Sequence, residues 1–213
     1  MLTVHHLGIS QSERIVWLCE EYGVDYELKI YPRDPETRLA PAEYKALHPA
    51  GTAPIITDGD VTLAETGAIF EYILAKYAPG KGMLSPDHKD YADYLYWYHF
   101  VNGSFVPAGM TVMIMEMLGD AVPEPVKAGL GARFTKGYAM VEERLSSNTW
   151  MAGETFTAAD IMMVFSLSTA RYFFPKDLTD FPAIRAYLKR ASEMPSYKRA
   201  MAKAEPDMEP MLA

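Results

Sequence analysis

Residues 48–66 carry the clearest structural signal in this chain, and they read HPAGTAPIITDGDVTLAET. Two β-rich triplets, IIT and VTL, flank the pair Asp58-Gly59, and an Asp-Gly pair between two such runs is a strong hairpin signal. Pro54 has no N–H group to donate to a sheet ladder, so we expect it at the start of the first strand. The stretch therefore predicts a short β-hairpin that is preceded by a proline.

The segment after the hairpin predicts a helix. Residues 67–77 carry apolar side chains at helical spacing, which places Thr66 at or near the helix N-terminus. Free N–H groups and the helix dipole favour a carboxylate there, and Glu65 beside it can receive an ammonium group. An α-amino acid carries both charges, so the pair suits such a ligand. The structural alternative is that Thr66 only caps the helix and Glu65 is a first-turn acid.

The N-terminal part of the chain, residues 1–77, has the pattern of a mixed α/β unit. Alternating apolar positions predict strands at 2–5 and 24–30, and the helix between them is expected to end at Gly23. A short helix near 41–46 precedes the hairpin. The predicted order of elements is therefore β-α-β-α-β-β-α.

The rest of the chain reads as helical. A Gly/Pro linker follows the N-terminal part, and helical spacing of apolar residues continues from Asp87 onward. Pro107 is expected to kink or interrupt the first of these helices. Residues 157–160, which read TAAD, form a capping-box pattern with Phe156 and Ile161 placed as its hydrophobic staple. The fold class is therefore α/β followed by all-α.

Two motifs far apart in the sequence carry a family resemblance. The proline before the hairpin, with the Glu-Thr pair after it, and the phrase FTAADI at 156–161 resemble the cytosolic glutathione S-transferase superfamily in its bacterial form. The resemblance extends along essentially the whole chain. It implies a thioredoxin-like domain at 1–78, a linker at 79–86 and an all-helical C-terminal domain at 87–213.

The resemblance also implies reduced glutathione as the co-substrate. In this family the X-Pro bond before the third strand is cis, so Ala53 beside Pro54 would offer its backbone N–H and C=O groups to the peptide. Glu65 and Thr66 match the pair that holds the γ-glutamyl end. These four residues are the predicted glutathione-binding residues.

A transferase of this kind needs a donor that stabilises the thiolate, because a free thiol has a pKa of about 8.5 and is mostly protonated at neutral pH. The family places this donor after the first strand, where this chain reads LGISQSERIVW and has no tyrosine or cysteine. The pattern Ser-x-x-x-Arg of serine-type, theta- and delta-like members matches Ser10 and Arg14. Ser10 is the predicted catalytic residue, and Ser12 is the alternative. That both serines merely cap the helix is the structural alternative.

The resemblance implies a second-substrate pocket between the domains, for a hydrophobic electrophile. Tyr98, Met110 and Met113 are the candidates to line it, since methionine offers an adaptable apolar surface. A methionine stripe on a helix is also typical of core packing, so this alternative stays open.

Composition excludes several other classes of protein. The chain of 213 residues has a net charge of −8 and no basic run, which argues against a nucleic-acid partner. We expect no membrane span, because no apolar run reaches about 18 residues, and no signal peptide. Cys19 is the only cysteine, which excludes an internal disulfide and fits the cytoplasm; on its apolar helix stripe it is expected to be an inert core residue. The five histidines show no metal-ligand spacing, so no metal is expected.

The predicted function is a glutathione S-transferase that activates the thiol of reduced glutathione for attack on an electrophilic organic substrate. One alternative keeps the same site for glutathione-dependent peroxide reduction or isomerisation. Another is a catalytically inactive, transferase-like binding or regulatory protein, because fold alone never proves function. The resemblance further implies a homodimer.

Overall fold

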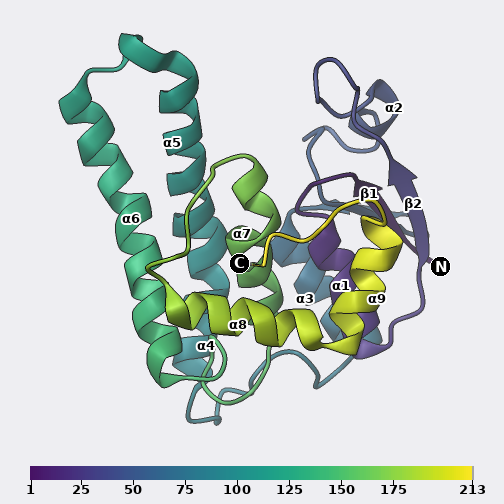
Figure 1. Cartoon of the computed structure of the whole chain (residues 1–213). Coiled ribbons are helices and arrows are strands. Elements are labelled where there is room, and N and C mark those ends of the chain that lie inside the picture. Colours follow the sequence, from purple (N-terminus) through teal and green to yellow (C-terminus); the bar gives the residue numbers. More distant parts are fainter. Residues whose placement is uncertain (213) are drawn as a thin grey trace. The chain divides into compact units, whose positions relative to one another are not determined.

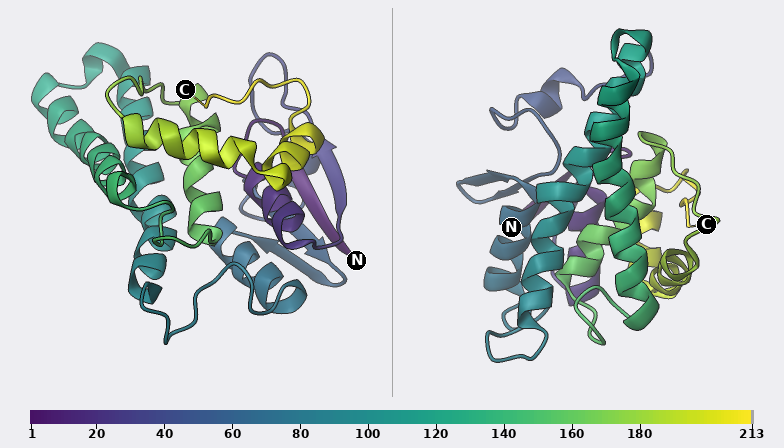
Figure 2. Two further views of the ribbon diagram at one scale, coloured as in Figure 1. Left: turned by 60° about the horizontal axis from the view of Figure 1, so that its bottom comes forward. Right: turned by 90° about the vertical axis from the view of Figure 1, so that its left-hand side faces the viewer.

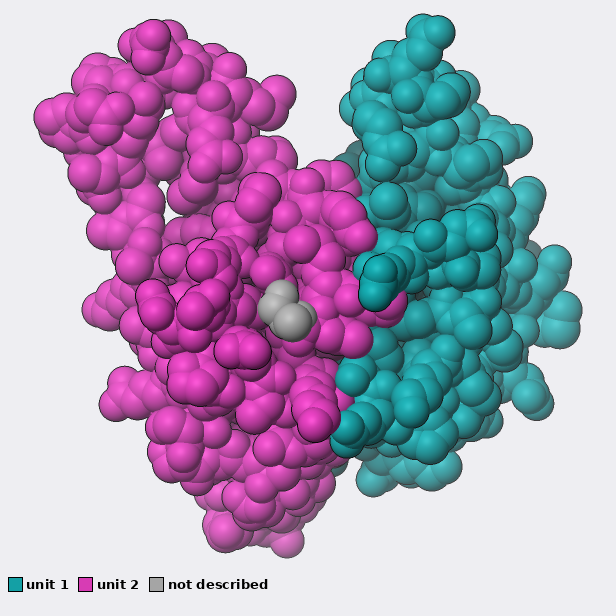
Figure 3. All heavy atoms as spheres, viewed as in Figure 1, with its two compact units in different colours: residues 1–83, 192–209 teal, residues 84–191, 210–213 magenta. Residues whose placement is uncertain are grey.

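The computed structural model describes residues 1–212 of the chain (Figures 1 and 2). These residues form two compact units, which Figure 3 shows in different colours. Unit 1 contains Met1–Met83 and Ser192–Glu209, and unit 2 contains Leu84–Ala191 and the residues from Pro210 on. The first boundary falls within the predicted linker.

Unit 1 is built on a four-stranded sheet with the strand order β2-β1-β3-β4. Strands β1 and β2 pair in parallel, whereas β1 with β3 and β3 with β4 pair antiparallel. The predicted order of elements and the thioredoxin-like fold class are confirmed. The elements are β1 (Leu2–Leu7), α1 (Glu13–Tyr22), β2 (Glu27–Tyr31), α2 (Ala42–Lys45), β3 (Ile55–Asp58), β4 (Val61–Ala64), α3 (Thr66–Tyr77) and α9 (Pro195–Ala204).

The pairing register brings three chain segments to one edge of the sheet. His5 near the end of β1 lies opposite Ile55 at the start of β3, and Ile55 lies opposite Ala64 at the end of β4. The turn after β1, the residues before β3 and the start of α3 therefore share this edge. This edge is where the sequence predicted the glutathione site.

Hydrophobic packing holds this edge in place. Leu7, Tyr31, Tyr44, Ile55 and Ala64 form one buried cluster, in which the ring of Tyr44 from α2 packs edge-on against Tyr31 at 5.1 Å between ring centroids. Ala53 is partly buried against the same cluster. All four strands contribute to this cluster, so it fixes their ends relative to one another.

The C-terminal helix α9 packs on α1 within unit 1 (Figure 1). The indole Nε1 of Trp17 donates to Ser196 Oγ at 3.1 Å, and the ring of Trp17 meets Tyr197 edge-on. On the outer side of this contact, Arg199 pairs with Glu20 at 3.0 Å. The predicted helical domain, 87–213, contains α9, so the compact units and the predicted domain ranges differ at this segment. The ranges themselves stay a prediction.

The remaining elements are helical, and α5 and α6 run side by side as a long pair (Figure 2). Pro107 lies in the first turn of α5, directly after a π-helical turn at Val101–Phe105. A proline lacks the N–H group and crowds the carbonyl four residues earlier, so the preceding turn widens instead of ending the helix. These elements are α4 (Tyr91–Phe100), α5 (Val106–Leu118), α6 (Glu124–Ser147), α7 (Ala158–Leu167), α8 (Pro182–Glu193) and single 3-10 turns at Gly119–Ala121 and Thr169–Tyr172.

The predicted capping box of α7 is confirmed. Asp160 Oδ2 accepts the backbone N–H of Thr157 at 2.8 Å, and Asp160 Oδ1 accepts the N–H of Met151 at 2.8 Å and the hydroxyl of Tyr187 at 3.1 Å. Burial raises the pKa of Asp160 to about 6, although these hydrogen bonds oppose the shift. Every residue of α7 is buried, so this cap closes the start of a core helix.

One helical segment bears on the expectation that no membrane span is present. The continuous helical segment Tyr91–Ala121 is long enough to span a membrane and has a window of mean hydropathy 1.2. By length and composition it passes a test for membrane-spanning helices, whereas our expectation rested on uninterrupted apolar runs. A third of that window, 33%, is buried within the protein, and core helices of soluble proteins pass the same test.

Candidate active site

The site begins at the turn that follows β1. Gly8 N–H donates to Tyr31 O at 3.1 Å, and Ile9 adopts a positive φ of 50°, which is uncommon for a β-branched residue. The guanidinium of Arg33 donates to Gly8 O at 2.7 Å and to Ile9 O at 3.0 Å. The backbone of this turn is therefore held by the end of β2 and by the residues that follow it.

The two candidate serines lie in direct contact with each other. Their Oγ atoms are 2.7 Å apart, and Ser10 Oγ also donates to Leu7 O at 2.7 Å. Ser12 Oγ accepts the N–H of Leu7 at 3.1 Å. Ser12 has no exposed surface and Ser10 is 6% exposed. Ser12 occupies the N-cap position of α1, yet its hydroxyl makes no capping bond and points back to the end of β1.

A histidine and a distant glutamate extend this pair of hydroxyls. His6 Nδ1 lies 2.9 Å from Ser12 Oγ, and His6 Nε2 lies 3.0 Å from Glu205 Oε1. The same carboxylate oxygen accepts the N–H of Ile9. Neither His6 nor Glu205 is among the residues that the sequence predicted for the site. The alternation of β1 could have placed His6 on the inner face, but nothing local could have found a partner 199 residues away.

The residues predicted to bind glutathione lie at the same edge of the sheet. The Ala53–Pro54 bond is cis, as expected. Glu65 is exposed at the start of α3 with a φ of 72°, and Thr66 is buried with its hydroxyl 3.4 Å from Gln11 Oε1. Glu65 occupies the N-cap position of α3 without a side-chain capping bond, and Thr66 is the first residue of the helix, so Thr66 is not its N-cap residue.

Gln11 connects the starts of the two helices that meet at this edge. Its Oε1 accepts a hydrogen bond from Arg14 of α1 at 2.7 Å and from Thr66 of α3. The N-termini of both helices carry partial positive charge, and the Arg14 side chain is almost fully buried beside them. This surface therefore favours an anionic ligand, such as a carboxylate or a thiolate.

Sequence models of two domains match the chain. The glutathione S-transferase N-terminal domain matches residues 10–76, and the glutathione S-transferase C-terminal domain matches residues 105–195. Glutathione S-transferase 3 of Schizosaccharomyces pombe is 31% identical, over 96% of this chain and 88% of the relative. The chain belongs to the glutathione S-transferase family.

Solved structures agree with this assignment. A glutathione S-transferase from Actinobacillus pleuropneumoniae has a TM-score of 0.88 and 35% identity, and the alignment covers 96% of this chain and 93% of that one. A sphingomonad glutathione S-transferase complexed with glutathione has a TM-score of 0.76 over 97% of this chain and all of its own, 100%. At 22% identity the second likeness shows the shared fold alone.

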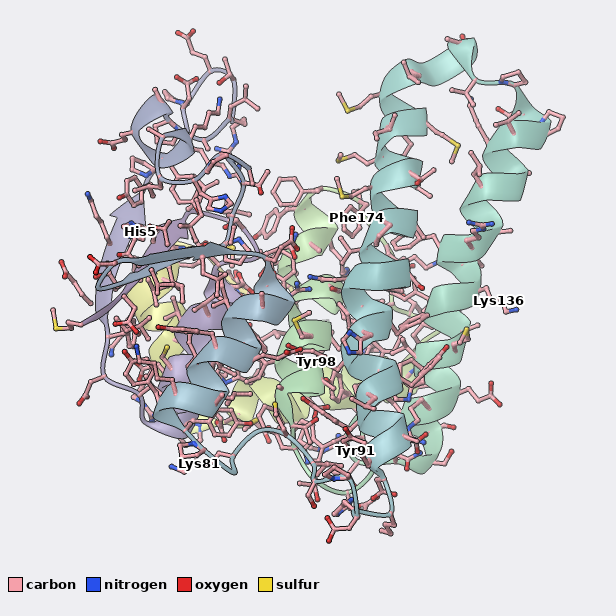
Figure 4. All side chains as sticks on the ribbon, turned by 180° about the vertical axis from the view of Figure 1, so that it is seen from behind. His5, Lys81, Tyr91, Tyr98, Lys136 and Phe174 are labelled. Atoms are coloured by element: carbon pink, nitrogen blue, oxygen red, sulfur yellow. The ribbon has the colours of Figure 1, made fainter. Side chains whose placement is uncertain are left out.

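The three residues predicted to line the pocket for the second substrate of the transferase all belong to unit 2. Tyr98 is 3% exposed and stacks on Tyr94 at 5.7 Å between ring centroids, whereas Met110 is 46% exposed and Met113 is half-buried on α5. A cavity of about 720 Å³ between α4 and α6 includes none of them, and Figure 4 labels Lys136 on its α6 side. Of the three, Tyr98 is thus the most enclosed, and their role at the second substrate stays a prediction.

Two further groups of this transferase have structural roles. The thiol of Cys19 is fully buried in α1, and burial raises its pKa to about 12, which fits the inert core residue that we expected. His5, labelled in Figure 4, places one ring nitrogen 3.0 Å from Tyr31 Oη and the other 3.0 Å from Thr57 Oγ1. Among residues 1–212, no three His, Cys, Asp or Glu side chains cluster as a metal site would require.

Proposed function

We propose that the protein is a glutathione S-transferase that holds the thiol of reduced glutathione as a thiolate and adds it to an electrophilic organic compound. The observation that carries this proposal is the convergence, at one sheet edge, of the serine turn, the residues before β3 and the start of α3. The 31% identity with a named transferase over nearly the whole chain supports it.

The residues at this edge take separate roles in the proposal. Ser10 donates to the thiolate, with Ser12 as the alternative donor, which makes this a serine-type transferase similar to the theta and delta classes. Ala53, before Pro54, pairs its backbone with the peptide. Glu65 receives the ammonium of the γ-glutamyl end, and Thr66 at the start of α3 receives its carboxylate.

The chemistry follows from the environment of the thiol. A hydroxyl that donates to sulfur stabilises the thiolate over the thiol, and the N-terminus of α1 adds positive potential. The thiolate is the nucleophile, so lowering the thiol pKa raises its concentration at neutral pH. Binding both substrates then aligns sulfur and electrophile, which removes much of the entropic cost of the encounter.

Two measurements test this function. The protein is expected to be retained on immobilised glutathione and released by free glutathione, and to conjugate glutathione to members of a panel of hydrophobic electrophiles. Retention without turnover on any electrophile, hydroperoxide or maleyl substrate would instead favour the binding protein. Turnover confined to hydroperoxides or maleyl compounds would favour the peroxidase or isomerase, which the names of the relatives do not suggest.

We also propose that the transferase is a cytoplasmic homodimer that uses no metal and binds neither nucleic acid nor membranes. The acidic net charge of −8 and the family membership support this part of the proposal. Tyr98, Met110 and Met113 remain candidates for contact with the hydrophobic electrophile. Sedimentation at micromolar concentration tests the oligomeric state, and a monomer would contradict it.

A further inference from the structure

A chain of four polar side chains runs from the end of α9 to the serine turn. Glu205 Oε1 lies 3.0 Å from His6 Nε2, His6 Nδ1 lies 2.9 Å from Ser12 Oγ, and Ser12 Oγ lies 2.7 Å from Ser10 Oγ. We call these four residues the buried hydroxyl chain. His6 and Ser12 have no exposed surface, and Ser10 and Glu205 are 6% and 9% exposed.

The donors and acceptors of this chain can be assigned by elimination. A carboxylate only accepts hydrogen bonds, so the proton between Glu205 and His6 belongs to His6 Nε2. When the imidazole is neutral with its proton on Nε2, Nδ1 is an acceptor 2.9 Å from Ser12 Oγ, whereas Leu7 O lies farther away at 3.3 Å, so we assign the Ser12 proton to the bond with His6. The Ser12 hydroxyl then uses its proton in the bond to His6, and the Ser12 side chain has no exposed surface.

Ser10 keeps a proton that can be redirected. Its Oγ lies 2.7 Å from both Leu7 O and Ser12 Oγ, so either oxygen can accept the Ser10 proton in the absence of ligand. The Ser12 oxygen already accepts the N–H of Leu7, which fixes its position in the turn. Turning the Ser10 hydroxyl toward a thiolate therefore costs one exchangeable hydrogen bond and disturbs no other member of the chain.

We propose that His6, oriented by Glu205, is a positioning residue. Its Nδ1 accepts the Ser12 proton, so that Ser10 is the hydroxyl that donates to the bound thiolate. This inference rests on the proposed transferase function and resolves the choice between the two serines. It also gives the C-terminal segment a role in the site, because Glu205 holds both the His6 ring and the N–H of Ile9.

The structure fixes Glu205 in this position through α9. The N–H of Glu205 donates to Met201 O at 2.8 Å, so the residue ends the helix that Trp17 and Glu20 anchor on α1. Arg33, which follows β2 and donates to the backbone of the turn after β1, also interacts electrostatically with Glu205. The buried hydroxyl chain thus ends on the Glu205 carboxylate, on which the Arg33 guanidinium acts.

The first experiment measures the His6 tautomer by NMR of the isotope-labelled imidazole nitrogens at neutral pH. The wild type is expected to carry its proton on Nε2 alone. Glu205→Gln keeps an oxygen that can accept from His6 and from Ile9, so it should keep this tautomer. Glu205→Ala removes the acceptor and should shift the proton toward Nδ1. A wild-type ring protonated on Nδ1, or a tautomer unchanged by Glu205→Ala, overturns the proposal.

The second experiment compares two replacements of His6. The amide of Asn reaches the position of Nδ1, so its oxygen can still accept from Ser12. The amide of Gln reaches the position of Nε2, so it can keep the hydrogen bond to Glu205 but loses the one from Ser12. His6→Gln is expected to raise the pKa of the bound glutathione thiol and to lower kcat about tenfold, with KM for glutathione nearly unchanged. His6→Asn should lose distinctly less. Equal losses in both variants, or none in either, overturn the proposal.

The two proposals fail in different ways. A wild type that neither binds nor conjugates glutathione overturns the proposed function, while the tautomer measurement still tests the hydrogen-bond assignment. An active wild type with unaffected His6 variants overturns only this inference. If the His6 variants do not fold, as judged by thermal unfolding, kcat of Glu205→Ala must fall further than kcat of Glu205→Gln, and equal values overturn the proposal.

Discussion

Two buried acids organise the two units of this protein, and they do so differently. In unit 2, Asp160 accepts the N–H groups of Thr157 and Met151 and the hydroxyl of Tyr187, so all its partners are structural. In unit 1, Glu205 accepts from Ile9 and His6. That second network continues to the Ser10 hydroxyl, which has alternative acceptors.

The difference separates a stabilising network from a functional one. A closed network in which each donor has one acceptor fixes a fold, and opening it is costly because buried polar groups lose their partners. A network that ends on a hydroxyl with a choice of acceptors can transfer that hydrogen bond to a ligand. Damage to the first should therefore appear in stability, and damage to the second in catalysis.

The largest effect is expected at the closed network. Asp160→Ala leaves the N–H groups of Thr157 and Met151 without their acceptor and leaves the Tyr187 hydroxyl only the backbone oxygen of residue 160 at 3.3 Å, so the free energy of unfolding should fall by about 3 to 5 kcal/mol. Denaturant unfolding measures this loss. Below the unfolding transition, kcat should be retained; a native-like stability with a lost kcat would reverse the comparison.

Ser10→Ala should have the largest effect on catalysis. Removing the donor to the thiolate is expected to lower kcat about 100-fold and to shift the pH–rate profile to alkaline pH, with little change in KM for glutathione or in stability. Ser12→Ala is the matched variant. If Ser12→Ala abolishes turnover in a folded protein while Ser10→Ala is fully active, the thiolate donor is Ser12. If neither affects turnover, backbone N–H groups at the start of α1 hold the thiolate.

Glu65→Gln should affect binding instead of turnover. The ammonium of glutathione loses a charged partner, and hydrogen bonds to charged groups are worth about 1.5–3 kcal/mol, so KM for glutathione should rise at least about tenfold. Steady-state kinetics with glutathione as the varied substrate measures this rise. A fall in kcat at an unchanged KM would place Glu65 in the chemical step and contradict its proposed role.

The smallest effect is expected at the edge of the closed network. Tyr187→Phe keeps the ring and removes the hydroxyl, which lies 3.1 Å from Asp160 Oδ1 and 3.3 Å from Asp160 O, so the free energy of unfolding should fall by about 1 kcal/mol. Activity should match that of the wild type. A loss comparable to that of Asp160→Ala would mean that the Tyr187 hydroxyl, and not the capping box, holds this region together.

The sequence predicted the fold where the signal is local. The Asp58-Gly59 turn, the proline before β3 and the Thr157–Asp160 cap act over a few residues, so their geometry follows from the residue types themselves. The same locality placed Glu65 and Thr66 at the start of α3. Hydropathy does not decide the nature of Tyr91–Ala121, because core helices of soluble proteins and membrane spans pass the same test of length and composition.

The sequence by itself determined the element order, the class of fold and a turn with two serines. It could not rank the serines, because Ser10 and Ser12 differ only in their surroundings. The tertiary structure decided that Ser12 is enclosed beside His6 and that Glu205, after a helix packed on α1, lies at the other side of the ring. The physical reason is that a hydroxyl has one proton, and its direction depends on acceptors that only folding brings within reach.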